Sequence, residues 1–132
     1  MNVVQISDWK IYLRDGEQFL QTAKSAHLKK KKGFSPEALY NLTCMGIEKL
    51  IMAFLMKNGD LAENHTMEDL LRAMDKHLSP DNDIGDKLRY LDSFQEICEL
   101  DSYIAKKPTC DEIKKILQIG DDLHYHLAPH IY

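Results

Sequence analysis

Residues 35–59, SPEALYNLTCMGIEKLIMAFLMKNG, decide the fold of this chain. Ser35 can cap a helix, and Pro36 stands at the first helical position, where proline costs nothing. Asn58 and Gly59 are typical of a helix end, about six turns further on. Between these ends the helix is apolar nearly all round, so it has to be covered on every side. We therefore expect this helix to lie at the centre of a helical bundle.

Two amphipathic helices flank this segment, because apolar side chains recur on both sides of it at three- and four-residue steps. The first is expected to be capped by Ser7 and to end in residues 29–33, KKKKG, where cations suit the negative end of the helix dipole. The third is expected to open on Thr66 with Asp69 and to stop at Ser79, which a proline follows.

Two more helices complete the chain. Asp83 is the expected cap of a fourth helix, and Thr109 with Glu112 forms a capping box for a last one, which Pro129 is expected to end. No segment has the alternating pattern of a strand, and the connections are short. The sequence therefore predicts an all-α protein, an up-and-down antiparallel four-helix bundle with an additional short helix, five helices in all.

The composition is that of an ordered protein with one domain, residues 1–132. Of its 132 residues 44% are apolar and 29% charged, and the net charge of −4 argues against a uniformly basic surface that coats nucleic acid. Three widely spaced cysteines favour reduced thiols and a cytoplasmic location. The N-terminus lacks a secretory signal, and the most apolar stretch, residues 44–56, contains two charges, so no membrane role is expected.

Residues 38–55 and 65–71 carry an ordered set of features: ALYNL, then GIEKLIMAFL with its pair Glu48 and Lys49, then Gly59, then HTMEDLL. In this combination they resemble the HEPN family (higher eukaryotes and prokaryotes nucleotide-binding). The likeness is clear over the second helix and the start of the third, and looser elsewhere. The resemblance implies an up-and-down bundle that is usually dimeric. It also implies a protein that occurs alone or together with a minimal nucleotidyltransferase in a toxin and antitoxin pair. Some members of the family act as metal-independent ribonucleases.

The ribonuclease members carry an arginine and, four to six residues later, a histidine near the start of the last helix. Residues 109–128 of this chain contain no arginine. One pair with that spacing, Arg72 and His77, falls at the end of the third helix, where cations also suit the helix dipole. The resemblance therefore implies a non-catalytic binding module. The alternatives are a ribonuclease or toxin with Arg72 and His77 as a displaced catalytic pair, and a purely structural helical adaptor.

The implied partners are a second copy of the chain, a nucleotide or RNA, and a nucleotidyltransferase. The sequence itself favours a homodimer, because a helix that is apolar all round is hard to cover in so small a bundle. Gly16, Gly46 and Gly120 lie inside helices, where each glycine costs roughly 1 kcal/mol relative to alanine. Close packing of helix backbones is one explanation of these glycines. A ligand lying over Gly46 is the other.

The candidate ligand-binding residues are Lys29, Lys30, Lys31, Lys32, Glu48, Lys49 and His65. The lysine run can hold phosphate or be a solvated loop. Glu48, a carboxylate in an apolar segment, needs a tyrosine or lysine from another helix, or faces a ligand groove or dimer seam. His65 is expected to bond the helix end beside it. No metal or cofactor is expected, since no carboxylate or cysteine completes a site around His126 and His130.

Overall fold

The structure, a computed structural model, describes residues 8–62, 64–95 and 108–132. Every regular element in these ranges is helical, as the sequence predicts. The elements are α1 (Trp9–Leu28), α2 (Pro36–Lys57), α3 (Met67–Asp75), α4 (Asn82–Asp92), the 3₁₀ turn η2 (Ser93–Gln95) and α5 (Cys110–Ile131).

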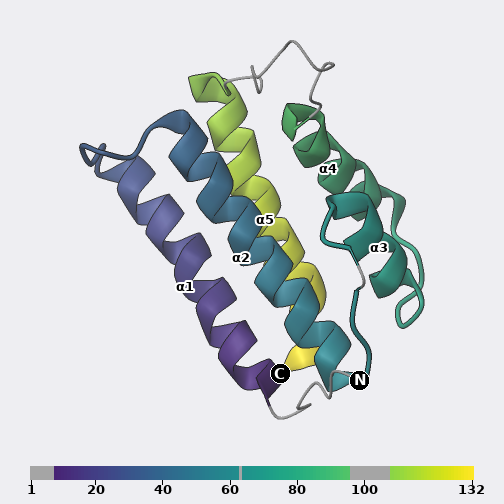
Figure 1. Ribbon diagram of the computed structural model, residues 1–132. Helices are drawn as coiled ribbons and strands as arrows, with labels where there is room; N and C mark the ends of the chain where they lie inside the picture. Colours follow the sequence, from purple (N-terminus) through teal and green to yellow (C-terminus); the bar gives the residue numbers. More distant parts are fainter. Residues whose placement is uncertain (1–7, 63, 96–107) are drawn as a thin grey trace.

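The helices form an up-and-down bundle, which confirms the predicted architecture. α1, α2, α4 and α5 run in alternating directions, and the short α3 is inserted between α2 and α4 (Figure 1). α3 and α4 form an antiparallel pair beside the three long helices. α2 packs on α1, α3 and α5, and it reaches α4 through the Tyr40 hydroxyl, which donates to the carbonyl oxygen of Leu91 at 2.7 Å.

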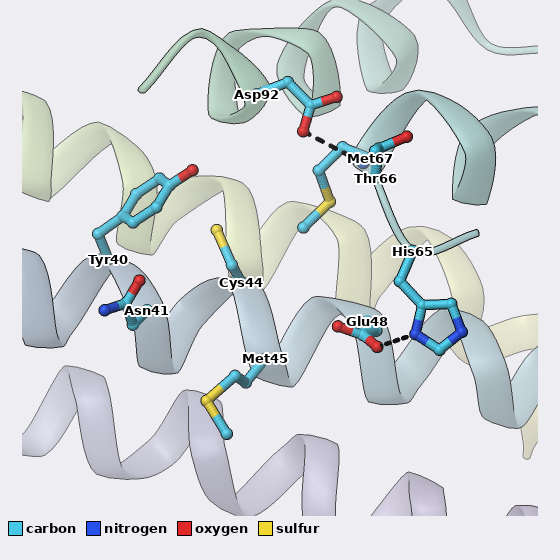
Figure 2. Close-up of a pocket in the computed structure, with 9 residues that line it drawn as sticks. All are labelled: Tyr40, Asn41, Cys44, Met45, Glu48, His65, Thr66, Met67 and Asp92. Atoms are coloured by element: carbon cyan, nitrogen blue, oxygen red, sulfur yellow. Dashed lines mark hydrogen bonds and ion pairs between the residues drawn. The ribbon is translucent and has the colours of Figure 1, made fainter. Parts of the chain in front are cut away.

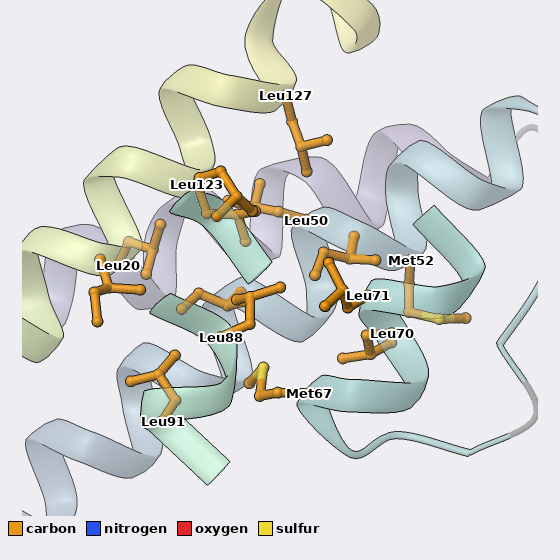
Figure 3. Packing of buried hydrophobic residues seen from close by; sticks show 14 of the residues in the cluster. Leu20, Leu50, Met52, Met67, Leu70, Leu71, Leu88, Leu91, Leu123 and Leu127 are labelled. Carbon is orange, nitrogen blue, oxygen red and sulfur yellow. The ribbon is translucent and has the colours of Figure 1, made fainter. Parts of the chain in front are cut away.

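α2 is covered almost entirely by its own chain. Side chains from α2, α3, α4 and α5 converge in the core, among them Leu50, Leu71, Leu88 and Leu123 (Figure 3). α2 is long and apolar enough to cross a membrane by length and composition, but 72% of its most apolar window is buried inside the bundle. It is the core helix of a bundle. A dimer partner is therefore not required to cover it.

The predicted helix starts are confirmed at three of the capping sequences. Ser35 Oγ accepts from the backbone N–H of Ala38 at 3.1 Å, and Thr66 Oγ1 accepts from that of Asp69 at 3.0 Å. At the start of α5, Thr109 and Glu112 form both hydrogen bonds of a capping box. The predicted cap Ser7 lies outside the described residues.

The predicted start of α4 and the predicted end of α3 are wrong. α4 is capped by Asp81, whose Oδ1 accepts from the N–H of Ile84 at 3.1 Å, while Asp83 lies in the first turn and pairs with Lys87. α3 ends at Asp75, and a turn carries the chain on toward Ser79. At the start of α4 three adjacent residues, Asp81, Asn82 and Asp83, are all of types that cap helices, so the sequence alone does not select among them.

The sequence predicts that Pro129 ends the last helix, but Pro129 lies inside that helix. α5 continues to Ile131, which is only 1% exposed, and Leu127 before it is fully buried. Lys57 Nζ from the end of α2 donates to the carbonyl oxygen of Ile131 at 2.8 Å. Burial of Ile131 and this hydrogen bond offset the single backbone donor that the proline lacks.

The glycines inside the helices mark the places where helix backbones approach closely. A Cβ atom on Gly46 would lie 2.8 Å from Leu20 Cδ2 and 3.0 Å from the carbonyl oxygen of Gly16. A Cβ atom on Gly120 would lie 2.9 Å from Leu20 Cδ2 and 3.2 Å from Thr43 Cγ2. Close packing therefore explains these glycines, and a ligand over Gly46 is not needed.

Replacing Gly46 with alanine should lower the free energy of unfolding by about 1–3 kcal/mol, because the added methyl group overpacks the crossing of α1 and α2. The matched control is Gly85→Ala in α4, where a Cβ atom would meet only Arg89 Nη1 at 3.3 Å and Leu71 Cδ2 at 3.4 Å. That variant should be neutral or more stable by up to about 1 kcal/mol, through helix propensity. Urea unfolding followed by circular dichroism measures both. Equal stability of the two variants would contradict this account of Gly46.

Candidate functional site

A first cleft of about 590 Å³ lies where α1 ends and α2 and α5 begin. We call it the lysine cleft. Buried or half-buried apolar side chains form its floor, and Lys30, Lys31 and Lys114 are exposed around it. Its lining residues are Ala26, His27, Leu28, Lys30, Lys31, Phe34, Pro36, Leu39, Cys110, Ile113 and Lys114. Lys29 and Lys32, the other two predicted lysines, are exposed but do not line the cleft.

Lys30 stands in a backbone conformation that favours glycine. Its φ is +48°, and its N–H donates to the carbonyl oxygen of His27 at 3.2 Å, while the N–H of Lys31 donates to that of Ala26 at 3.1 Å. The same pair of hydrogen bonds ends α2, where Gly59 takes the left-handed position with φ +73°. A side chain in this conformation costs about 1 kcal/mol. Such strain is found more often at functional sites, so the exposed Lys30 beside the cleft is a candidate for a functional role.

A second cleft, of about 330 Å³, lies between α2, the start of α3 and the end of α4 (Figure 2). We call it the acidic cleft, because Glu48 and Asp92 line it and no lysine or arginine does so among the described residues. Its other lining residues are Tyr40, Asn41, Cys44, Met45, His65, Thr66 and Met67. The predicted ligand residues Glu48 and His65 thus come together here.

Glu48 and His65 form a hydrogen-bonded pair in the acidic cleft: His65 Nδ1 contacts Glu48 Oε1. The sequence predicts a tyrosine or a lysine as the partner of Glu48 and a helix-end group as the partner of His65, and both predictions are wrong, because the two side chains pair with each other. In Figure 2 the other ring nitrogen of His65 is turned away from the remaining labelled side chains. Lys49 points elsewhere, with its Nζ 4.4 Å from the ring centroid of Tyr12, so the predicted residues Glu48 and Lys49 do not share a site.

Asp92 joins the end of α4 to the start of α3. Its two carboxylate oxygens accept from the backbone N–H groups of Met67 at 3.1 Å and Glu68 at 3.2 Å. These N–H groups belong to the first helical turn, where backbone donors have no partners within the helix. Asp92 thus fixes one wall of the acidic cleft, and this pairing could not be predicted from the sequence, because it joins residues far apart in the chain.

Burial dominates the chemistry of Cys44 in the acidic cleft. Burial and, to a smaller extent, the negative charges of Asp92 and Glu48 raise the pKa of the thiol to about 12, against a hydrogen bond with Tyr40 that lowers it. Since the thiolate is the nucleophilic form, Cys44 lines the cleft as a protonated, weakly reactive thiol at neutral pH.

Arg72 and His77, the alternative catalytic pair, are held by different carboxylates. Arg72 Nε lies 3.6 Å from Glu68 Oε1, and His77 Nε2 lies 2.9 Å from Asp60 Oδ2. The hydrogen bond with His77 is the main cause that lowers the pKa of Asp60. Neither Arg72 nor His77 lines the lysine cleft or the acidic cleft.

The remaining histidines make no metal site in the part of the chain that the structure describes. There no group of three histidine, cysteine or acidic side chains is placed to hold a metal ion. His126 Nδ1 lies 4.0 Å from Asp81, and the ring of His130 packs edge-on against Phe54.

The fold and its clefts define an all-α bundle with one cationic and one acidic cleft. Comparison with protein-family models, with curated proteins and with solved structures found no match for the chain.

Alkylation should distinguish the cysteines on either side of the bundle. At pH 8 we expect iodoacetamide to modify the exposed Cys110 at least about tenfold faster than Cys44, because almost none of the buried thiol is ionised. Peptide mass spectrometry over time measures each site separately. Urea-unfolded protein, in which the two thiols should react at similar rates, is the control. Equal rates in the folded protein would show that the Cys44 thiol is not buried and that its pKa is not raised.

Proposed function

We propose that this chain is a non-catalytic, HEPN-like binding module that engages a nucleotide, free or within RNA, in the lysine cleft. The observation that carries the proposal is the combination found there, an apolar floor beneath three lysines from two parts of the fold. A nucleotide has matching halves, an aromatic base and an anionic phosphate. The cleft volume of about 590 Å³ lies in the range typical of sites for small organic ligands.

The charges of the lysine cleft suit phosphate. Lys30 and Lys31 approach from the end of α1, and Lys114 approaches from the first turns of α5. α2 and α5 also begin at this cleft, and helix N-termini carry partial positive charge. No carboxylate lines the cleft among the described residues. A phosphate group here would therefore contact lysines and no carboxylate, since Glu37, Asp111 and Glu112 of the first turns lie outside the lining.

The floor of the lysine cleft suits a base. Leu39 and Ile113 are 5% and 2% exposed and form a rigid apolar surface. Phe34, which is partly buried against the core, adds an aromatic ring. Stacking of a base on an aromatic side chain contributes about 1–3 kcal/mol and is tolerant of base identity. A nucleotide and an unpaired base of RNA are both consistent with such a floor.

Binding is favoured over cleavage because the lysine cleft offers cations and apolar surface rather than an acid–base pair. Arg72 pairs with Glu68 and His77 contacts Asp60, both away from the cleft. A homodimer and a nucleotidyltransferase partner belong to the proposal on the family resemblance alone, since α2 is already buried within one chain. Light scattering at micromolar concentration tests the dimer, and a monomer there would remove it from the proposal.

Replacing Lys30 with glycine should make the fold more stable and the binding of a nucleotide weaker. We expect the free energy of unfolding to rise by about 0.5–1 kcal/mol, because glycine relieves the left-handed strain. Affinity for ATP should fall by about fivefold or more, as one charge-assisted contact is lost. Lys114→Ala should weaken binding similarly, and the affinity of the unaltered protein should fall as salt rises. Calorimetric titration with ATP and with a short unstructured RNA measures these effects.

The matched control for these variants is Lys76→Ala, which removes the same charge from an exposed lysine at the end of α3. Its affinity for ATP should equal that of the unaltered protein. Equal losses in all three variants, or no saturable binding of either probe, would contradict the proposal. RNA cleavage that disappears in the Arg72→Ala, His77→Ala double variant would instead favour the ribonuclease.

A further inference from the structure

The acidic cleft has a charge opposite to that of the lysine cleft, and nucleotide binding makes no use of it. Glu48 comes from the middle of α2 and Asp92 from the last turn of α4, so two elements bring negative charge to one small space. The nearby cations are turned away from it. Lys49 lies over the ring of Tyr12, and Arg89 pairs with Glu68.

One oxygen of Glu48 is available to a ligand. His65 contacts Oε1, whereas Oε2 has no hydrogen-bond partner among the described residues. Figure 2 shows the free end of this carboxylate on the side of the cleft where Cys44 and Met67 lie. Both oxygens of Asp92 already accept backbone N–H groups. Asp92 therefore adds negative potential, and Glu48 supplies the vacant acceptor.

The negative potential reaches the floor of the cleft. Asp92 and Glu48 both disfavour ionisation of the Cys44 thiol, which is largely buried. Charges act more strongly in such a partly buried space than in bulk water. A second anion is therefore excluded there, and a cation is attracted.

The walls limit the size and polarity of what can enter. The volume of about 330 Å³ is at the lower end of the range for small-ligand sites. Tyr40, Met45 and Met67 give it an aromatic ring and two thioethers, and Met45 leaves 44% of its surface exposed at the mouth. Methionine side chains adapt to ligands of varied shape. The matching ligand has a short apolar chain and a compact positive head.

We propose that the acidic cleft binds a primary ammonium group on a short alkyl chain, with the ammonium donating to Glu48 Oε2 and the chain lying against Met45, Met67 and Tyr40. A free alkylamine and the side chain of a lysine both present this chemistry. The site is separate from the lysine cleft, so it does not depend on the nucleotide proposal.

The test uses the full chain and titrates 1-butylamine, followed by backbone amide NMR shifts. We expect saturable shifts centred on Cys44, Glu48 and His65. The neutral 1-butanol and the anionic butyrate should bind at least about tenfold more weakly, since they lack the charge-assisted hydrogen bond. Nα-acetyl-lysine methylamide distinguishes the two sources. Binding as tight as that of butylamine would assign the ammonium to a protein side chain, and much weaker binding would assign it to a free amine.

Glu48→Gln should weaken butylamine binding by about tenfold while leaving the spectrum of a folded bundle, because glutamine keeps the shape and loses the charge. Glu37→Gln, at the start of the same helix and outside the cleft, is the matched control and should bind like the unaltered protein. A second pair avoids any loss of folding. At the exposed Asn41, aspartate should strengthen binding several-fold and lysine should weaken it. Butanol binding as tight as butylamine, or equal affinities in the Glu48 and Glu37 variants, would overturn the proposal.

Discussion

The close crossing of α1 and α2 sets the geometry on which the rest of the bundle depends. The Gly16 carbonyl would lie 3.0 Å from a Cβ atom on Gly46, so the two backbones meet with no side chain between them. Leu20 fills the space beside this crossing and also reaches Gly120 of α5. One leucine therefore packs against glycines of two other helices. Because interiors are close-packed, an atom added at Gly46 has to displace both the Leu20 side chain and the backbone of α1 at Gly16.

Fixing α2 at the centre determines where the two clefts form. Its first turn meets the end of α1 and the start of α5, where the half-buried Phe34 and the buried Leu39 line the lysine cleft. The short pair α3 and α4 lies beside α2 without covering its full length (Figure 1). Glu48 lines the acidic cleft between these helices, and its side chain is 34% exposed. Both clefts thus form at parts of α2 that the neighbouring helices do not cover completely.

A feature of the fold could be predicted from the sequence where its physical cause lies within a few residues of it. The caps Ser35 and Thr109 and the strongly apolar centre of α2 act within a few residues, and they were predicted correctly. The errors at Asp83 and Pro129 have another origin. There a local signal was overridden by the burial of Ile84 and Ile131, which depends on helices far away in the chain.

The candidate sites show the same limit more sharply. The lysine run was visible in the sequence, but only the fold separates Lys30 and Lys31, which line a cleft, from Lys29 and Lys32, which do not. Lys114 was not predicted at all, because α5 reaches the end of α1 only through packing. A periodic pattern gives the side of a helix on which a residue lies, but not which residue of another helix lies opposite.

The segregation of charge follows from this arrangement. A net charge of −4 suggests a weakly acidic surface, yet the fold collects cations at the end of α1 and carboxylates between α2 and α4. Asp92 belongs to the second group because the first N–H groups of α3 need an acceptor. A structural requirement, the capping of a short helix, thereby places a negative charge beside Glu48. The acidic cleft is in this sense a consequence of how α3 is held on the bundle, and its charge cannot be removed at Asp92 without loosening that helix.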